Sequence, residues 1–206
     1  MTTKHQISPP GGWRILDGAR LQPMPLNEAG LATRLKLFLL KRFYKLDVAN
    51  VHLLMKHNPR LHRGVSALTA KLMPQGELER KDTEIVILRV AWNCRSYYEW
   101  GQHVEIGLHA GLTTDDIAHI SQGHEAPGWN AKQAALLKAC DEFHHERLIS
   151  GDTWHQLTTY FDKKLLLELL FLIGFYEGLA GVLNSTGIPL DAEVEKHLAA
   201  LSFQEK

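Results

Sequence analysis

The chain has 206 residues, enough for one domain with a sizeable core or for two smaller modules. Its 23 Lys and Arg residues balance 23 Asp and Glu residues, and this zero formal charge gives no overall field that would attract nucleic acid or an anionic membrane. Cys94 and Cys140 form neither a CxxC motif nor a disulfide framework, which is typical of a reducing compartment. We therefore expect a cytoplasmic protein that binds neither nucleic acid nor membrane.

The first 26 residues hold prolines and glycines without helical periodicity. The sequence predicts an extended N-terminal arm over 1–26, which either wraps the domain or a partner, or stays mobile. It lacks the apolar stretch of a secretory signal, so nothing suggests export. Residues 27–206 are predicted to form a single all-helical domain, because no run there shows sustained strand alternation.

Helix start and stop signals recur along this domain. Asn58 before Pro59 resembles an N-cap followed by a proline in the first turn, Gly76 and Gly111 suit helix ends, and Thr114 suits a helix start. The expected helices span 28–45, 48–56, 59–73, 82–92, 96–110, 114–121, 130–148, 152–160, 163–183 and 191–201.

The most apolar stretch, LLLELLFLIGFYEGLAGVL at 165–183, contains Glu168 and Glu177, which favours a buried helix over a membrane span. These carboxylates and Tyr176 must be paired if they are buried, and they either line a pocket or join subunits. Because apolar side chains cover every direction of this helix, it must be enclosed on all sides. The sequence therefore predicts a homo-oligomer whose interface buries well over about 1,000 Å².

The stretch YYEWGQHVEIG places Glu99 and His103 four residues apart, on one face of a helix. Asp82 is a suitable N-cap that would put Glu84 in the first turn of its helix, where the dipole favours a carboxylate. Ser96 and Glu99 also spell a capping box, which would turn the Glu99 carboxylate away from His103. An imidazole flanked by carboxylates has an assigned tautomer and suits general acid/base chemistry, but a lone histidine is more often a satisfied core residue.

Metal and cofactor signals are weak. Glu99 and His103 could supply two ligands from one helix face, but the sequence shows no third or fourth ligand at a suitable spacing. His144 and His145 are adjacent, hence about 100 degrees apart on a helix, and are expected at the surface. There is no Gly-rich phosphate loop and no nucleophile elbow. We therefore predict no metal and no cofactor, with a small-molecule substrate as the partner.

The segment ELERKDTEIVILRVAWNCRSYYEWGQHVEIGLHAGLTTDDI resembles the core of the carboxymuconolactone decarboxylase family, within the alkylhydroperoxidase D-like superfamily. The tail LLFLIGFYEGLAGVLNSTGIPLD is similar to the C-terminal part of the longer members, and the string Tyr98-Glu99-Trp100-x-x-His103 is the most specific part. The resemblance implies an all-α, alkylhydroperoxidase D-like helical bundle that forms oligomers, with its site near the start of the helix that carries His103.

The peroxidase branch of this superfamily uses a glutamate, a CxxC pair at a helix start and a histidine as a proton relay. Glu84 and His103 match the outer members of that relay, whereas Ser96 and Glu99 occupy the cysteine positions. Cys94 lies two residues too early and has no partner nearby in the sequence. The chain is therefore expected to lack disulfide-linked peroxide reduction.

The decarboxylase branch also lacks the cysteine pair, and its chemistry converts a small lactone acid into an enol-lactone. The resemblance implies that His103 supplies the acid that protonates the carbon losing carbon dioxide, with Glu84 or Glu99 orienting it. The predicted catalytic residues are thus His103, Glu99 and Glu84. The predicted substrate-binding residues are Arg89, Arg95, Ser96, Tyr98 and Trp100, the arginines because of their closeness in the sequence.

The leading hypothesis is cofactor-free acid/base chemistry on a small carboxylated or carbonyl compound, by decarboxylation or a related lyase or isomerase step. One alternative is a thiol-dependent peroxidase or antioxidant protein, in which a helix start lowers the pKa of Cys94. Another is a non-catalytic oligomeric binding protein. It is favoured if Glu99 is engaged in the capping box, Glu84 points to solvent and no enclosed pocket contacts His103.

Overall fold

The computed structural model describes residues 7–44 and 48–201, and within these ranges every regular element is a helix. The all-α prediction is confirmed, and each predicted helix is present with ends that differ by at most three residues. The helices are α1 (Leu31–Tyr44), α2 (Ala49–Met55), α3 (Pro59–Leu72), α4 (Arg80–Asn93), α5 (Tyr97–His109), α6 (Thr114–Gln122), α7 (Ala131–Glu146), α8 (Gly151–Thr158), α9 (Lys163–Thr186) and α10 (Ala192–Ala200).

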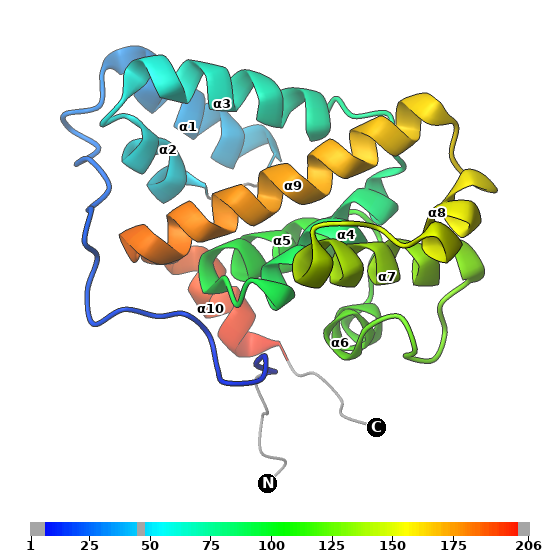
Figure 1. Ribbon diagram of the computed structural model, residues 1–206. Coiled ribbons are helices and arrows are strands. Elements are labelled where there is room, and N and C mark those ends of the chain that lie inside the picture. Colours follow the sequence, from blue (N-terminus) through cyan, green and yellow to red (C-terminus); the bar gives the residue numbers. More distant parts are fainter. Residues whose placement is uncertain (1–6, 45–47, 202–206) are drawn as a thin grey trace, which may run out of the picture.

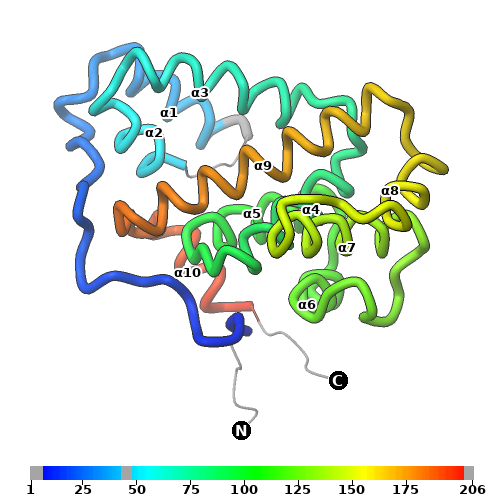
Figure 2. Tube along the Cα trace, in the orientation of Figure 1, coloured from blue at the N-terminus to red at the C-terminus, as the bar shows by residue number. Residues whose placement is uncertain are grey.

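The helices form two layers about the long helix α9. Figure 1 shows α1, α2 and α3 on one side of α9, and α4, α5, α6 and α7 on the other. The N-terminal segment follows one edge of both layers before it enters α1, as the tube in Figure 2 traces. Segments that are distant in the sequence therefore meet where α9 passes between the two layers.

Helix α4 is buried on all sides over residues 82–88. The side chains of Ile85, Val86, Ile87 and Leu88 have no solvent exposure, although four consecutive positions point in four directions. They divide between two apolar clusters, one shared with α5 and α10 and the other with α7, α8 and α9. Burying one such side chain contributes roughly 1.5–3 kcal/mol. Helix α5, which follows α4 and carries Glu99 and His103, is thus anchored to the centre of the molecule.

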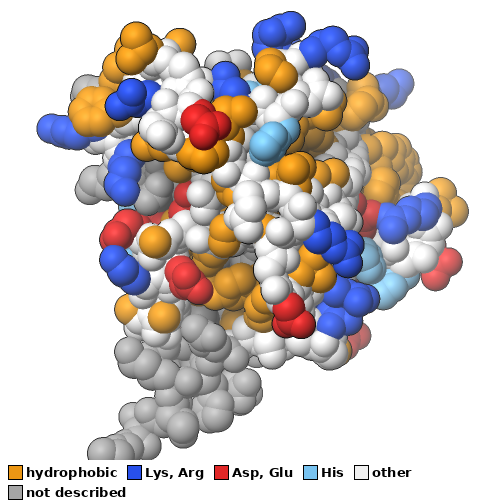
Figure 3. Space-filling view, turned by 90° about the vertical axis from the view of Figure 1, so that its left-hand side faces the viewer, with side chains coloured by type: hydrophobic (Ala, Val, Ile, Leu, Met, Phe, Trp, Pro, Cys, Tyr) orange, Lys and Arg blue, Asp and Glu red, His pale blue; other side chains and the backbone are white. Residues whose placement is uncertain are grey.

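Helix α9, by contrast, is not enclosed within the single chain. Leu167 and Phe171 are each 57% exposed, so the prediction of burial on all sides is wrong for the isolated chain. Helices α1 and α3 also expose apolar side chains, and the upper part of Figure 3 shows such side chains interspersed with Lys and Arg. By length and composition α9 could cross a membrane, but a core helix of a soluble protein passes the same test.

The polar groups of α9 are paired, as predicted. Glu168 accepts hydrogen bonds from the backbone N–H groups of Glu77 and Leu78, at 2.8 and 3.0 Å. Glu177 forms an ion pair with His144, and the Tyr176 hydroxyl contacts the sulfur of Met73. These groups therefore fix the path of other segments against α9.

The described part of the N-terminal arm lies along the domain. The backbone N–H of Arg14 donates to the carbonyl of Arg95, and that of Arg20 donates to the carbonyl of Thr186. Trp13 packs against Trp92, with ring centroids 5.6 Å apart. These contacts hold the arm over the turn between α4 and α5 and against the C-terminal end of α9.

Local capping explains several helix starts. Asn58 caps α3 ahead of Pro59, as predicted, and Thr113 with Asp116 forms a capping box at the start of α6. The expectation for Asp82 was wrong, because α4 begins at Arg80 and Asp82 lies inside its first turn. There Asp82 pairs with Lys132 of α7 at 2.6 Å, an ion pair that supports a nearly buried carboxylate.

Candidate active site

The centre of the candidate site is an ion pair between α4 and α5. Glu84 is fully buried, and its Oε2 lies 2.7 Å from Nδ1 of His103. Its Oε1 lies 2.6 Å from a guanidinium nitrogen of Arg80, one turn earlier on α4. The carboxylate therefore holds the imidazole through Nδ1, which leaves Nε2 as the ring nitrogen available for proton transfer.

Glu99 lies on the same face of α5, one turn before His103, and is 2% exposed. Neither of its carboxyl oxygens has a hydrogen-bond partner among the described residues. Ser96 is the N-cap of α5, but its side chain makes no capping bond, so the expected capping box is not formed. Burial raises the pKa of the Glu99 carboxyl well above its usual value, because an apolar surrounding disfavours the charged form.

Glu99 and His103 line one cavity of about 320 Å³ between the two helical layers. The walls are largely apolar and come from α1, α2, α3, α5 and α9. Tyr176 of α9 closes one side, with its ring edge-on to the His103 ring and the centroids 5.2 Å apart. An apolar enclosure of this size suits a small molecule and strengthens electrostatic contacts inside it.

Tyr98 also lines the cavity, and it ties the wall together. Its hydroxyl donates to Oδ2 of Asp191 at 2.8 Å and accepts from the backbone N–H of Val51 at 3.1 Å. Gln102 donates to the same Asp191 oxygen at 2.8 Å. Tyr98 thus has a structural role at the wall besides any contact with a ligand.

Three basic side chains of the cavity were not found by sequence reasoning. Lys36 of α1, His52 of α2 and His62 of α3 all line it, and Nδ1 of His52 lies 3.2 Å from Nε2 of His62. Burial, with the nearby Lys36 charge, lowers the pKa of His52 to about 3, so this imidazole is neutral at pH 7. The unusual count of twelve histidines was the only sequence signal for this group.

Arg89 does not reach the cavity. Its Nε and Nη2 donate to the two carboxylate oxygens of Asp141, at 2.6 and 3.0 Å. Its Nη1 donates to the carbonyls of Ile120 and Ser121. The guanidinium joins α4, α6 and α7, and the prediction that Arg89 binds substrate is not retained.

Arg95, Ser96 and Trp100 are also absent from the cavity wall. The guanidinium of Arg95 donates to the carbonyls of Gly11 and Gly12 in the arm. Ser96 is fully buried beneath the turn, and Trp100 is 1% exposed in a cluster with other tryptophans. Sequence closeness to His103 did not predict orientation, because residues that are neighbours along a helix point in different directions.

The fold is that of the alkylhydroperoxidase D-like class. A peroxidase-related protein from Silicibacter sp. TM1040 aligns with a TM-score of 0.74 at 16% identity, covering 87% of this chain and 95% of that one. A peroxidase-related protein from Ralstonia eutropha JMP134, titled an alkylhydroperoxidase AhpD core, gives 0.71 at 15% identity, covering 86% and 96%. The debrominase Bmp8 in complex with 2,3,4-tribromopyrrole gives 0.71 at 12% identity, covering 89% and 97%.

The carboxymuconolactone decarboxylase family model matches residues 59–142, which include α4, α5 and the Glu84–His103 pair. Over that segment the chain is similar to this family. No curated protein matches the chain.

Proposed function

We propose that this carboxymuconolactone decarboxylase-like protein performs cofactor-free acid/base chemistry on a small carboxylated or carbonyl compound in the cytoplasm. The reaction is a decarboxylation or a related lyase or isomerase step. One observation carries the proposal: a buried acid, Glu99, and a histidine oriented by Glu84 line the same largely apolar cavity.

The proposed chemistry assigns different roles to the two carboxyl groups. When a substrate carboxylate leaves as carbon dioxide, its bonding electrons stay on carbon and delocalise into an adjacent carbonyl. Glu99, as a protonated acid whose oxygens have no hydrogen-bond partner among the described residues, donates a hydrogen bond to that carbonyl oxygen. His103 delivers a proton to the carbon, and the ionised Glu84 stabilises the imidazolium before transfer. Glu84 itself stays engaged with Arg80.

We assign binding of the substrate carboxylate to Lys36 and the His52–His62 pair. These groups line the same cavity as Glu99 and come from helices on its other side. Lys36 supplies a cation, and a neutral imidazole supplies an N–H donor. They replace the predicted Arg89 and Arg95, which are engaged elsewhere.

The test is a turnover screen against small lactone acids and related β,γ-unsaturated or β-keto acids, with His103→Ala as the essential variant. The screen should find a substrate whose turnover falls at least about 100-fold in that variant. His109→Ala is the matched control, since His109 is exposed at the far end of the same helix. Unchanged turnover in His103→Ala would overturn the assignment.

A thiol-dependent peroxidase is the second candidate, favoured by the peroxidase-related structures that share the fold. Against it, burial raises the pKa of the Cys94 thiol to about 12 and also raises that of Cys140, contrary to the expected lowering at Cys94. Peroxide consumption with a thiol reductant should be lost in a Cys94→Ala, Cys140→Ala double variant if this activity exists. Its survival there would exclude both thiols.

The non-catalytic alternative depended on three geometries. It is favoured if Glu99 is engaged in a capping box, Glu84 points to solvent and no enclosed pocket contacts His103. In the described residues Glu99 makes no such bond, Glu84 is fully buried, and the cavity contacts His103. These features favour an active site over a binding surface alone.

A further inference from the structure

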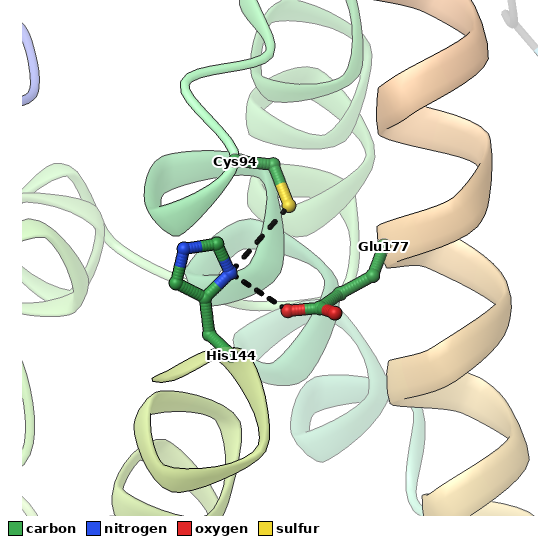
Figure 4. Close-up of side chains that lie close together, drawn as sticks. All are labelled: Cys94, His144 and Glu177. Carbon is green, nitrogen blue, oxygen red and sulfur yellow. Dashed lines mark hydrogen bonds and ion pairs between the residues drawn. The ribbon is translucent and has the colours of Figure 1, made fainter. Parts of the chain in front are cut away.

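A second cluster of polar side chains lies outside the cavity. Figure 4 shows Cys94, at the C-terminal end of α4, facing His144 in the last turn of α7 and Glu177 in the middle of α9. Sγ of Cys94 lies 3.9 Å from Nδ1 of His144, and that nitrogen lies 2.8 Å from Oε1 of Glu177. His144 is therefore half-buried in a cluster and not at the surface as expected.

The three donor atoms lie close together, and two of them contact the same ring nitrogen. In a Cys–His–acid catalytic triad, the nucleophile and the acid contact opposite nitrogens of the imidazole, so that a proton can pass through the ring. Here the sulfur and the carboxylate oxygen both face Nδ1. This arrangement cannot relay a proton across the ring, but it matches ligands arranged around a common centre.

The spacing and the donor types suit a transition-metal ion. All three ligand atoms lie within 4.8 Å of one another. Ligands bound to tetrahedral zinc at about 2.0 to 2.3 Å lie roughly 3 to 4 Å apart, so small side-chain adjustments would complete the site. A thiolate, an imidazole and a carboxylate together balance soft and hard donors, a combination that Zn²⁺ accepts.

The surroundings orient the ligands. Arg147, just after α7, forms an ion pair with Oε2 of Glu177, which leaves Oε1 turned toward Nδ1 of His144. The backbone carbonyl of Cys94 accepts a hydrogen bond from Asn184 of α9 at 2.9 Å, which fixes the end of α4 against α9. Partners of this kind commonly hold metal ligands in place.

We propose that Cys94, His144 and Glu177 form a Zn²⁺ site that joins the ends of α4 and α7 to α9. On binding, the thiol loses its proton to solvent, and the imidazole binds through Nδ1 with its proton on Nε2. The thiolate and the carboxylate balance the two charges of the ion. A water molecule completes four-coordination from the partly exposed side of the cluster, where the His144 side chain is 24% exposed.

The experiment uses the full chain, stripped with a chelator and titrated with Co²⁺, which reports its ligands through visible absorption, and then with Zn²⁺. One equivalent of Co²⁺ should produce tetrahedral bands and a thiolate charge-transfer band, both lost when Zn²⁺ displaces it. Cys94→Ser should abolish the charge-transfer band, while His144→Asn and Glu177→Gln should each weaken Zn²⁺ binding at least about 10-fold.

Two variants serve as controls. His145→Asn removes the adjacent histidine, whose ring centroid is 5.0 Å from that of His144 but which is outside the cluster. Cys140→Ser removes the other thiol. Both should bind Co²⁺ as the parent does, with folding checked by circular dichroism. A charge-transfer band that survives in Cys94→Ser, or no saturable Co²⁺ or Zn²⁺ binding by the folded parent, would overturn the proposal. Neither readout depends on enzymatic activity.

Discussion

Charged side chains near the two ends of α4 have different kinds of surroundings. Near its C-terminal end, Arg89 makes four contacts with Asp141 and two backbone carbonyls, so its donors are engaged by the protein itself. Near its N-terminal end, Glu84 holds His103 beside Glu99, whose oxygens have no partner among the described residues. Buried polar groups are normally satisfied, so an unsatisfied one marks a place where a ligand completes the bonding.

The bonding partners of a buried charged side chain indicate its role better than its position in the sequence does. A side chain whose partners are all in the protein stabilises the fold, whereas one beside an unpartnered polar group belongs to a candidate site. Arg89 and Glu84 lie on one helix and both belong to the matched family segment. Of the two, Glu84 contacts a residue of the cavity wall, His103, although it does not line the cavity itself.

The largest effect is expected for the homo-oligomer that we predict, in which a second copy of the chain covers the exposed face of α9. Helix α9 lines the cavity on one face and exposes Leu167 and Phe171 on another. We predict that light scattering at micromolar concentration gives a multiple of 23.3 kDa, and that a Leu167→Lys, Phe171→Lys variant dissociates. Leu148→Lys, at an even more exposed leucine beyond α7, should leave the mass unchanged. A parent mass near that of one chain would contradict the prediction.

Near the C-terminal end of α4, Arg89→Ala should lower the free energy of unfolding by about 3 kcal/mol. The substitution leaves Asp141 without its bidentate partner in a mostly buried site. Turnover per folded molecule should stay close to that of the parent. Urea denaturation gives the stability, with the exposed Arg60→Ala as control. A loss of turnover without a loss of stability would place Arg89 in the catalytic machinery after all.

Beside the Glu84–His103 pair, Glu99→Gln should stabilise the protein, and this stabilisation should increase as the pH rises. Since burial raises the pKa of Glu99, only the unfolded chain loses this proton between about pH 4.5 and the folded-state pKa, and the parent loses stability there. Gln removes that penalty, so the advantage should grow by up to about 1.4 kcal/mol per pH unit. Denaturation at several pH values measures it. A destabilising effect at neutral pH would mean that Glu99 is ionised and paired.

The smallest effect is expected at Lys36. Lys36→Met should weaken the binding of a carboxylated substrate about 10-fold, seen as a higher KM with little change in kcat, because the cation contacts the substrate away from the reacting carbon. Lys71→Met, an exposed lysine of α3, is the matched control. Equal KM values in all three proteins would remove Lys36 from the binding site.

The sequence predicted the helices well, because start signals such as Asn58 before Pro59 and Thr114 mark their beginnings and apolar periodicity marks their length. It also placed Glu84, Glu99 and His103 on two adjacent helices, through the family resemblance. It did not predict that Arg89 would meet Asp141, 52 positions away, since partners at long range depend on how whole helices pack.

The same limit hid Lys36, His52 and His62, which belong to three helices and meet only around the cavity. It also hid the convergence of Cys94, His144 and Glu177. Sequence spacing argued against a metal because no two of these lie on one helix turn. Apolar composition likewise predicted that α9 is enclosed, but composition does not say whether the covering surface belongs to the same chain.

The protonation state of Glu99 tests the central claim most directly. Infrared spectra of the full chain at neutral pH, taken as the difference between the parent and Glu99→Gln, report the carboxyl group of that residue alone. We predict a C=O stretching band of a protonated acid that is absent in the variant and persists until the pH rises well above the ordinary range of a glutamate. A carboxylate band in its place at neutral pH would contradict the proposed acid and the chemistry built on it.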